Sequence, residues 1–219
     1  MEILNKQTYI AIAKDKKQAD ALLSLPEKVL QFGTGVLLRA LPDYYINLAN
    51  LNGQFNGRVV MVKSTSTPVE SVYLDQDCLF TQVIRGIEDG RPVEEFELIT
   101  SVSRCLHANE NWKEVMQLTV SPDLQIIISN TTEVGIVYEE EIITDLTPKS
   151  FPAKLLSVLH HRFQFYKGDM NRGLVILPTE LIDKNADQLK NILTQLASFN
   201  QLSSDFQYWL NGANDFCNT

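Results

Sequence analysis

Cysteine and histidine are scarce in this sequence of 219 residues, and each occurs three times. The cysteines Cys78, Cys105 and Cys217 lie far apart, and none belongs to a C-x-x-C pair. Such spacing is typical of reduced thiols in an intracellular protein rather than of a disulfide framework. His160 and His161 are adjacent, whereas the histidine ligands of zinc are spaced for chelation. We therefore expect neither disulfides nor a bound metal ion.

Long apolar runs and clusters of basic residues are also lacking. No stretch approaches the roughly 18 consecutive apolar residues that a membrane-spanning helix needs. Charged residues interrupt the N-terminal segment, where a signal peptide would carry an apolar block. Acidic side chains outnumber basic ones by 27 to 19, and the net charge is -8. These features argue against a nucleic-acid or membrane partner and favour a cytoplasmic protein.

The overall composition is that of a soluble globular domain. Hydrophobic residues make up 44% and charged residues 21% of the chain, both close to the average for such domains. The length suits one large domain, and no internal repeat divides the sequence. We expect residues 1–219 to form a single domain.

Strand and helix patterns alternate along most of the chain. Strand patterns are short, apolar and bounded by glycine or proline, whereas helix patterns carry an apolar residue every three or four positions. The expected strands cover 28–32, 58–62, 124–129 and 173–178, and the expected helices cover 36–52, 109–120, 150–165, 187–199 and 203–212. The first of these helices is expected to bury a face formed by Val36, Leu37, Ala40, Tyr44 and Leu48.

Residues 79–104 depart from this alternation. Two strand patterns, 79–87 and 92–104, flank the pair Asp89-Gly90, which is a strong signal for a tight antiparallel turn. We expect this hairpin to be an insertion beside the main sheet. The remaining alternation predicts a mostly parallel sheet with helices on both faces, and thus an α/β fold of the Rossmann type.

Gly33 and Gly35 stand where the first expected strand gives way to a helix. Bare backbone at such a position can turn sharply and approach the pyrophosphate of a dinucleotide at the helix N-terminus. Leu38 replaces the third glycine of the usual fingerprint, so the pair alone is equally compatible with a structural turn. Its place in a strand-helix-strand unit favours dinucleotide binding.

The acidic residue that binds the ribose of NAD usually follows the second strand, about 20 residues beyond the glycines. Lys63, Ser64 and Thr65 stand there instead. Ser64 or Thr65 is suited to the ribose 2′-hydroxyl of NAD, whereas Lys63 is suited to the additional phosphate of NADP. The residues alone leave the choice of cofactor open.

Polar residues follow two later strands of the predicted sheet. Ligands of open α/β sheets bind outside the carboxyl ends of the strands, so the run 129–133 is a candidate for ribose or nicotinamide contacts. By the same argument Glu180 and Asn185 are candidates for contact with a substrate. The structural alternatives are a polar loop at 129–133 and a helix cap at Asp183 or Asn185.

Five segments, in order, make the sequence similar to the mannitol dehydrogenase family of long-chain polyol dehydrogenases, and in particular to members that act on sugar acids. They lie between about Val29 and Thr219 and read LQFGTGVLLRA, ISNTTEVGI, FPAKLL, GLVILPTELIDKNADQLK and NDFCNT. The resemblance implies an N-terminal Rossmann domain that binds NAD, followed by a helical C-terminal domain. It also implies the interconversion of tagaturonate and altronate in hexuronate catabolism.

The resemblance assigns residues to the cofactor and to the sugar acid by position. The cofactor residues include a G-x-G-x-x-x-R turn and a loop beside the nicotinamide, and they are Gly33, Gly35, Arg39, Asn130, Thr131, Thr132 and Glu133. The residues that face the substrate are Glu180 and Asn185. Thr179 and Ala186 depart from residues common in the family, and Leu181 stands where its mannitol-oxidising members have an asparagine. Most of the pocket residues that decide the substrate are missing from this sequence, so fructuronate and mannitol stay open as alternative substrates.

The resemblance gives no catalytic residue within this chain. The family's general base is a lysine in a K-x-x-x-x-N-x-x-H motif of the helical C-terminal domain, and the sequence does not contain this motif. We expect the cofactor-binding part of an enzyme, with the helical domain of the same polypeptide as its partner. The alternative is a stand-alone nucleotide-binding module without catalysis. Without the partner domain, apolar surface is expected at 178–182 and 206–216.

Overall fold

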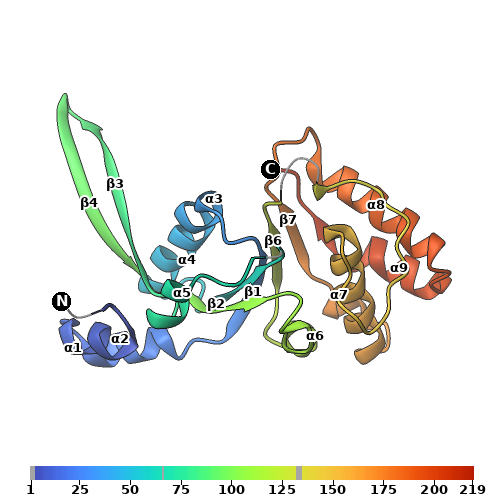
Figure 1. Cartoon of the computed structure of the whole chain (residues 1–219), viewed down its shortest axis with the longest axis horizontal. Helices are drawn as coiled ribbons and strands as arrows, with labels where there is room; N and C mark the ends of the chain where they lie inside the picture. Colours follow the sequence, from blue (N-terminus) through green and yellow to red (C-terminus); the bar gives the residue numbers. More distant parts are fainter. Residues whose placement is uncertain (1–2, 66, 132–134) are drawn as a thin grey trace.

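Strands and helices alternate along the chain in the computed structural model, which describes residues 3–65, 67–131 and 135–219 (Figure 1). The strands are β1 (Glu27–Phe32), β2 (Arg58–Lys63), β3 (Phe80–Glu88), β4 (Arg91–Ile99), β5 (Val102–His107), β6 (Ile126–Ser129), β7 (Val175–Pro178) and β8 (Asp215–Phe216). The helices are α1 (Lys6–Ile12), α2 (Lys16–Leu23), α3 (Val36–Ala40), α4 (Pro42–Leu51), α5 (Ser71–Asp75), α6 (Trp112–Thr119), α7 (Phe151–Phe165), α8 (Asn185–Phe199), α9 (Ser204–Gly212) and the 3₁₀ helix η2 (Met170–Arg172).

Six strands form one parallel sheet in the order β5-β2-β1-β6-β7-β8. The chain builds outward from β1 through β2 to β5, returns to the other side of β1, and continues outward through β6, β7 and β8. This order is that of the doubly wound fold that binds dinucleotides, in which the direction of winding reverses beside β1. The predicted α/β fold of the Rossmann type is confirmed.

Helices cover both faces of this sheet, so its central strands are apolar on both sides. Figure 1 shows α7, α8 and α9 grouped on one side of the sheet and α3 and α4 on the other. Leu30 and Phe32 of β1 belong to the larger core, which includes α6 to α9, whereas Val29 belongs to the smaller core with Leu38 of α3. The side chains of β1 therefore pack into both cores, one on each face of the sheet.

Pro42 divides the helix predicted for 36–52 into α3 and α4. Proline lacks the N–H that a continuous helix would need there, but it is well tolerated at the first position of a new helix. The predicted apolar face is also wrong, because Val36 is 70% and Leu37 44% exposed. The buried side chains of the two helices are Leu38, Asp43, Asn47 and Asn50.

The hairpin of β3 and β4 is confirmed, and the two strands pair antiparallel on either side of Asp89-Gly90. It extends away from the main sheet (Figure 1). Its second strand ends at Ile99, however, and 102–107 form β5 of the main sheet instead of continuing the hairpin. Thr100 lies between β4 and β5, where the chain leaves the hairpin and enters the main sheet. Its N and Oγ1 donate hydrogen bonds to Asn47 Oδ1, at 2.8 Å and 3.0 Å.

The C-terminal residues agree only in part with the apolar surface expected at 178–182 and 206–216. Leu181 is 85% exposed, as expected for the segment 178–182. The expectation of an apolar surface at 206–216 is wrong, because Phe206, Trp209 and Leu210 are at most 1% exposed and pack into the larger core. In the ranges that the structure describes, no helix combines the length and the apolar character needed to cross a membrane.

Candidate functional site

One cavity brings together the glycine turn, the end of β2 and the end of β6. It has a volume of about 310 Å³ and is lined by Phe32, Gly33, Thr34, Gly35, Lys63, Ser64, Thr65, Asn130 and Thr131. Because β1 pairs with β2 on one side and β6 on the other, the cavity lies where the winding of the sheet reverses. Ligands of doubly wound folds bind at this point.

The two glycines of the turn have different surroundings. Gly33 has a φ of 132°, and a Cβ there would lie 2.9 Å from Leu38 Cδ1 and 3.0 Å from the Asn130 carbonyl oxygen. Gly33 therefore allows the turn to pack closely against the end of β6. Gly35 is the N-cap of α3, and apart from Gly35 and its two chain neighbours no atom of the described chain lies within 4 Å of where its Cβ would be. The space beside Gly35 is open to a ligand.

Arg39 supports the turn from outside the cavity. Its Nε donates a hydrogen bond to the Thr34 carbonyl oxygen at 3.2 Å. Its guanidinium lies over the rings of Tyr73 and Phe80, 5.7 Å and 5.8 Å from their centroids. These contacts hold the Arg39 side chain against the turn. Its predicted contact with the cofactor stays a prediction.

Ser64 lines the cavity and carries a buried polar atom. Its Oγ is buried, and among the described residues it has no hydrogen-bond partner. A buried hydroxyl without a partner costs free energy unless a ligand or water satisfies it. The neighbouring Thr65 is held through its backbone, since its carbonyl oxygen lies 3.0 Å from His107 Nε2.

Lys63 forms an ion pair with Glu70, which was not among the predicted site residues. Lys63 Nζ donates a hydrogen bond to Glu70 Oε1 at 2.6 Å, and the Lys63 side chain is only 9% exposed. This bond holds the pKa of the Glu70 carboxyl below its ordinary value. The acidic residue that binds the ribose usually lies directly after the second strand, whereas Glu70 stands seven positions beyond Lys63. Only folding of the intervening loop brings the two charges together.

Asn130 and Thr131, which follow β6, form hydrogen bonds with Thr179 and Glu180, which follow β7. Asn130 Nδ2 donates to the Thr179 carbonyl oxygen at 2.9 Å and to Thr179 Oγ1 at 3.0 Å. Thr131 N and Oγ1 donate to Glu180 Oε1 at 2.8 Å and 3.0 Å. Two further predicted residues, Thr132 and Glu133, lie outside the described residues.

Glu180 and Asn185 are buried and hydrogen-bonded within the protein. Glu180 is 3% exposed, and its second carboxylate oxygen accepts a hydrogen bond from Ser129 Oγ at 3.2 Å. Asn185 is fully buried, and its Nδ2 donates to the Pro178 carbonyl oxygen at 2.9 Å and the Glu180 carbonyl oxygen at 3.1 Å. Both side chains thus order the loop after β7, and their contact with a substrate stays a prediction.

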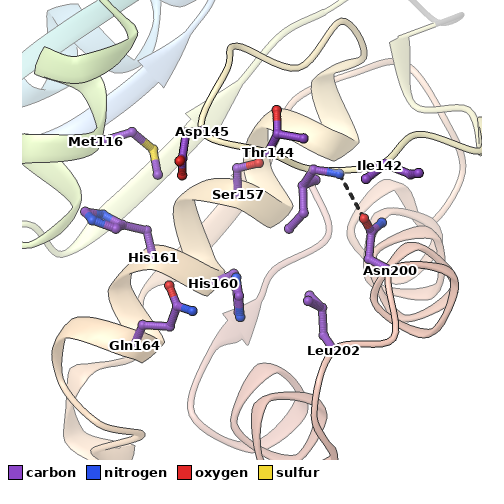
Figure 2. Close-up of a pocket in the computed structure, with 11 residues that line it drawn as sticks. Met116, Ile142, Thr144, Asp145, Ser157, His160, His161, Gln164, Asn200 and Leu202 are labelled. Atoms are coloured by element: carbon purple, nitrogen blue, oxygen red, sulfur yellow. Dashed lines mark hydrogen bonds between the residues drawn. The ribbon is translucent and has the colours of Figure 1, made fainter.

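A second cavity of about 300 Å³ lies beside α7, beneath the segment that contains Ile142 to Asp145 (Figure 2). The Ile143 N–H donates a hydrogen bond to Asn200 Oδ1 at 2.8 Å. Figure 2 draws this bond as the dashed line that ends on Asn200. His160 also lines this cavity, and burial, with His161 next to it, lowers the pKa of His160. This cavity shares no lining residue with the one at the glycine turn, and none of the predicted site residues that the structure describes lines it.

Comparisons with known proteins agree with the fold. An altronate oxidoreductase of Halalkalibacterium halodurans is 41% identical over 197 residues, which are 89% of this chain and 38% of that protein. An altronate oxidoreductase of Bacillus subtilis is 36% identical over 220 residues, which are 100% of this chain and 44% of that protein. The chain therefore spans less than half the length of these relatives.

Solved structures and a family model extend the comparison. The ternary complex of Pseudomonas fluorescens mannitol 2-dehydrogenase with NAD and D-mannitol superposes with a TM-score of 0.75 at 20% identity, over 97% of this chain and 45% of that one. A substrate-free D-sorbitol dehydrogenase gives the same TM-score at 14% identity, over 97% and 46% of the two chains. The model of the mannitol dehydrogenase Rossmann domain matches residues 27–219. This chain belongs to the mannitol dehydrogenase family, as its Rossmann domain.

Proposed function

We propose that this chain binds NAD(H) in the cavity at the glycine turn and forms the cofactor-binding part of a cytoplasmic oxidoreductase that interconverts tagaturonate and altronate. The observation that carries the proposal is the open glycine turn at the point where the winding of the sheet reverses. The names of the relatives support the substrate, because both are altronate oxidoreductases.

The residues around the cavity fit a dinucleotide. The open space beside Gly35 and the uncapped first turn of α3 suit the pyrophosphate, which backbone N–H groups bind. The unpartnered Oγ of Ser64 suits a ribose hydroxyl. Asn130 and Thr131, which directly follow β6 beside β1, suit the nicotinamide end. When bound, NAD(H) supplies hydride transfer, and the residues of this chain hold and orient it.

The chain's contribution to the substrate is the shape of the loops after β6 and β7. Ser129 and Thr131 donate to the carboxylate of Glu180, and Asn185 holds the backbone of the same loop. We assign Glu180 and Asn185 the task of positioning this loop at the sugar-acid end of the cavity. Proton transfer to the reacting oxygen is assigned to the helical domain of the complete polypeptide, in line with the greater length of the relatives.

Replacement of Gly35 tests the cofactor site. Gly35→Val should keep the fold, because the backbone at Gly35 has a φ of -69° and its Cβ position is open. It should weaken NADH binding by about tenfold or more, because the side chain takes the space assigned to the pyrophosphate. A fluorescence titration with NADH measures the affinity, and circular dichroism checks the fold.

Gly86→Val is the matched control, because Gly86 lies in β3 and a Cβ there would meet only Val93 Cγ2, at 3.9 Å. The control should bind NADH like the unchanged protein. Unchanged affinity in a folded Gly35→Val protein would contradict the site.

A separate assay tests the substrate. The complete polypeptide is assayed with tagaturonate, fructuronate and mannitol. If fructuronate or mannitol is turned over fastest, that substrate replaces tagaturonate in the proposal. If none of the three is turned over, the result favours the stand-alone nucleotide-binding module.

A further inference from the structure

Two cations flank one carboxylate next to the glycine turn. Lys63 Nζ donates to Glu70 Oε1 at 2.6 Å, and the Glu70 side chain remains 53% exposed. The positive charge of Arg39 also contributes to the lowered pKa of Glu70. Glu70 thus neutralises part of a positive region while keeping carboxylate surface available to a ligand.

This group of charges has room beside it. Arg39 and Glu70 line a neighbouring cavity of about 400 Å³, together with Val72, Tyr73, Gln76, Leu79 and Phe80. Lys63 lines the cavity at the glycine turn on the other side. The Lys63–Glu70 pair therefore lies between the two cavities. In doubly wound folds, the region after the second strand is where the ribose of the adenosine is bound.

We propose that Glu70 selects NAD over NADP, an inference that rests on the proposed function of the cavity. The Glu70 carboxylate accepts a hydrogen bond from the ribose 2′-hydroxyl of NAD and repels the 2′-phosphate of NADP. It also occupies Lys63, which would otherwise bind that phosphate. The same position thus favours one cofactor and opposes the other.

The pair explains how a lysine at the end of β2 is compatible with NAD. A free lysine there would be a phosphate ligand. With Glu70 removed, Lys63 and Arg39 become two cations without their shared carboxylate, a combination that suits the additional phosphate of NADP. Glu70 is therefore a specificity-determining residue, and Lys63 is the residue through which its removal acts.

The test compares the dissociation constants of NADH and NADPH by fluorescence titration of the 219-residue chain. We expect the unchanged protein to bind NADH more tightly. Glu70→Gln should tighten NADPH binding and weaken NADH binding, so that the ratio of the two constants shifts by about tenfold or more toward NADPH. Adding Lys63→Met to Glu70→Gln should remove the gain for NADPH.

The control is Glu94→Gln, which removes the same charge from an exposed ion pair with Arg85 on the hairpin. It should leave the ratio unchanged, and circular dichroism verifies the fold of every variant. Three results overturn the role of Glu70 while leaving the cavity's function intact: tighter NADPH binding by the unchanged protein, an unchanged ratio in Glu70→Gln, or an equal shift in Glu94→Gln. A gain for NADPH that persists without Lys63 overturns the proposed action through Lys63. Failure of the unchanged protein to bind either dinucleotide saturably overturns the proposed function itself.

Discussion

Asp43 is a fully buried carboxyl group one side chain away from the glycine turn. Gln31 links the two, because its Nε2 donates to Asp43 Oδ2 and to the Gly33 carbonyl oxygen, both at 3.3 Å. Asp43 Oδ1 and Gln31 Oε1 are buried, and within the described chain neither has a hydrogen-bond partner. Two neighbouring acceptors without a donor favour a proton on Asp43.

Burial raises the pKa of Asp43 from 3.8 to about 7, and the hydrogen bond from Gln31 and the charge of Arg39 oppose this only in part. A raised pKa in the folded protein means that Asp43 stabilises the fold at low pH. This stability is lost as the pH rises from about 4 through 7.

Asp43→Asn keeps the shape of the side chain and removes its titration. We expect the variant to be more stable than the unchanged protein by on the order of 3 kcal/mol at pH 8, with the difference vanishing near pH 4. Urea unfolding at several pH values measures this difference. Asp20→Asn, at an exposed position of α2, is the control. A difference that does not depend on pH would contradict the assignment of a buried, protonated Asp43.

At the scale of elements, Arg162 joins the end of α7 to the loop between α6 and β6. It is 2% exposed, and its guanidinium donates to the carbonyl oxygens of Thr119 at 2.6 Å, Ser121 at 3.1 Å and Leu124 at 3.3 Å. Its Nε donates to the Arg172 carbonyl oxygen at 2.6 Å. One planar group thus satisfies four backbone acceptors from two segments.

Arg162→Lys should destabilise the protein by about 3 kcal/mol, because an ammonium group cannot reproduce the planar fork and leaves buried carbonyl groups without donors. The free energy of unfolding in urea provides the measurement. Arg85→Lys on the hairpin, where the side chain is 74% exposed, should change stability little. Equal stability of the two variants would show that the four hydrogen bonds contribute little to the fold.

The elements also show how far local patterns predict this fold. The central strands and the long helices were predictable, because they are buried through apolar side chains that repeat with a regular period. The buried face of α4 was not, because it is polar: Asn50 exchanges hydrogen bonds with Gly57, and Asn47 binds Thr100. The start of β5 depends on the same long-range contact with Asn47. Asn47 and Thr100 are 53 residues apart, so no short stretch of sequence contains both partners of this contact.

The candidate site follows the same division at the scale of the whole molecule. Gly33, Gly35, Ser64, Asn130 and Thr131 were predicted from their places at strand ends, and the parallel sheet brings those ends together at one cavity. Glu70 was not predicted, because its position depends on the path of the loop after β2 rather than on a strand end. Topology therefore made the strand-end residues predictable, whereas ion pairing across a loop required the structure.

The share of the relatives that this chain covers leads to a prediction about activity. The chain spans 38% and 44% of the two altronate oxidoreductases, and the cavity at the glycine turn lies wholly within it. We expect the 219-residue chain to bind NADH but to oxidise it with tagaturonate at least about 10²-fold more slowly than a complete relative, because general acid–base groups alone contribute that much. The assay follows NADH absorbance, with the complete Bacillus subtilis altronate oxidoreductase measured in parallel. Comparable turnover would mean that a general base lies within this chain, and Glu133, Lys154 and Lys184 would be the first residues to replace.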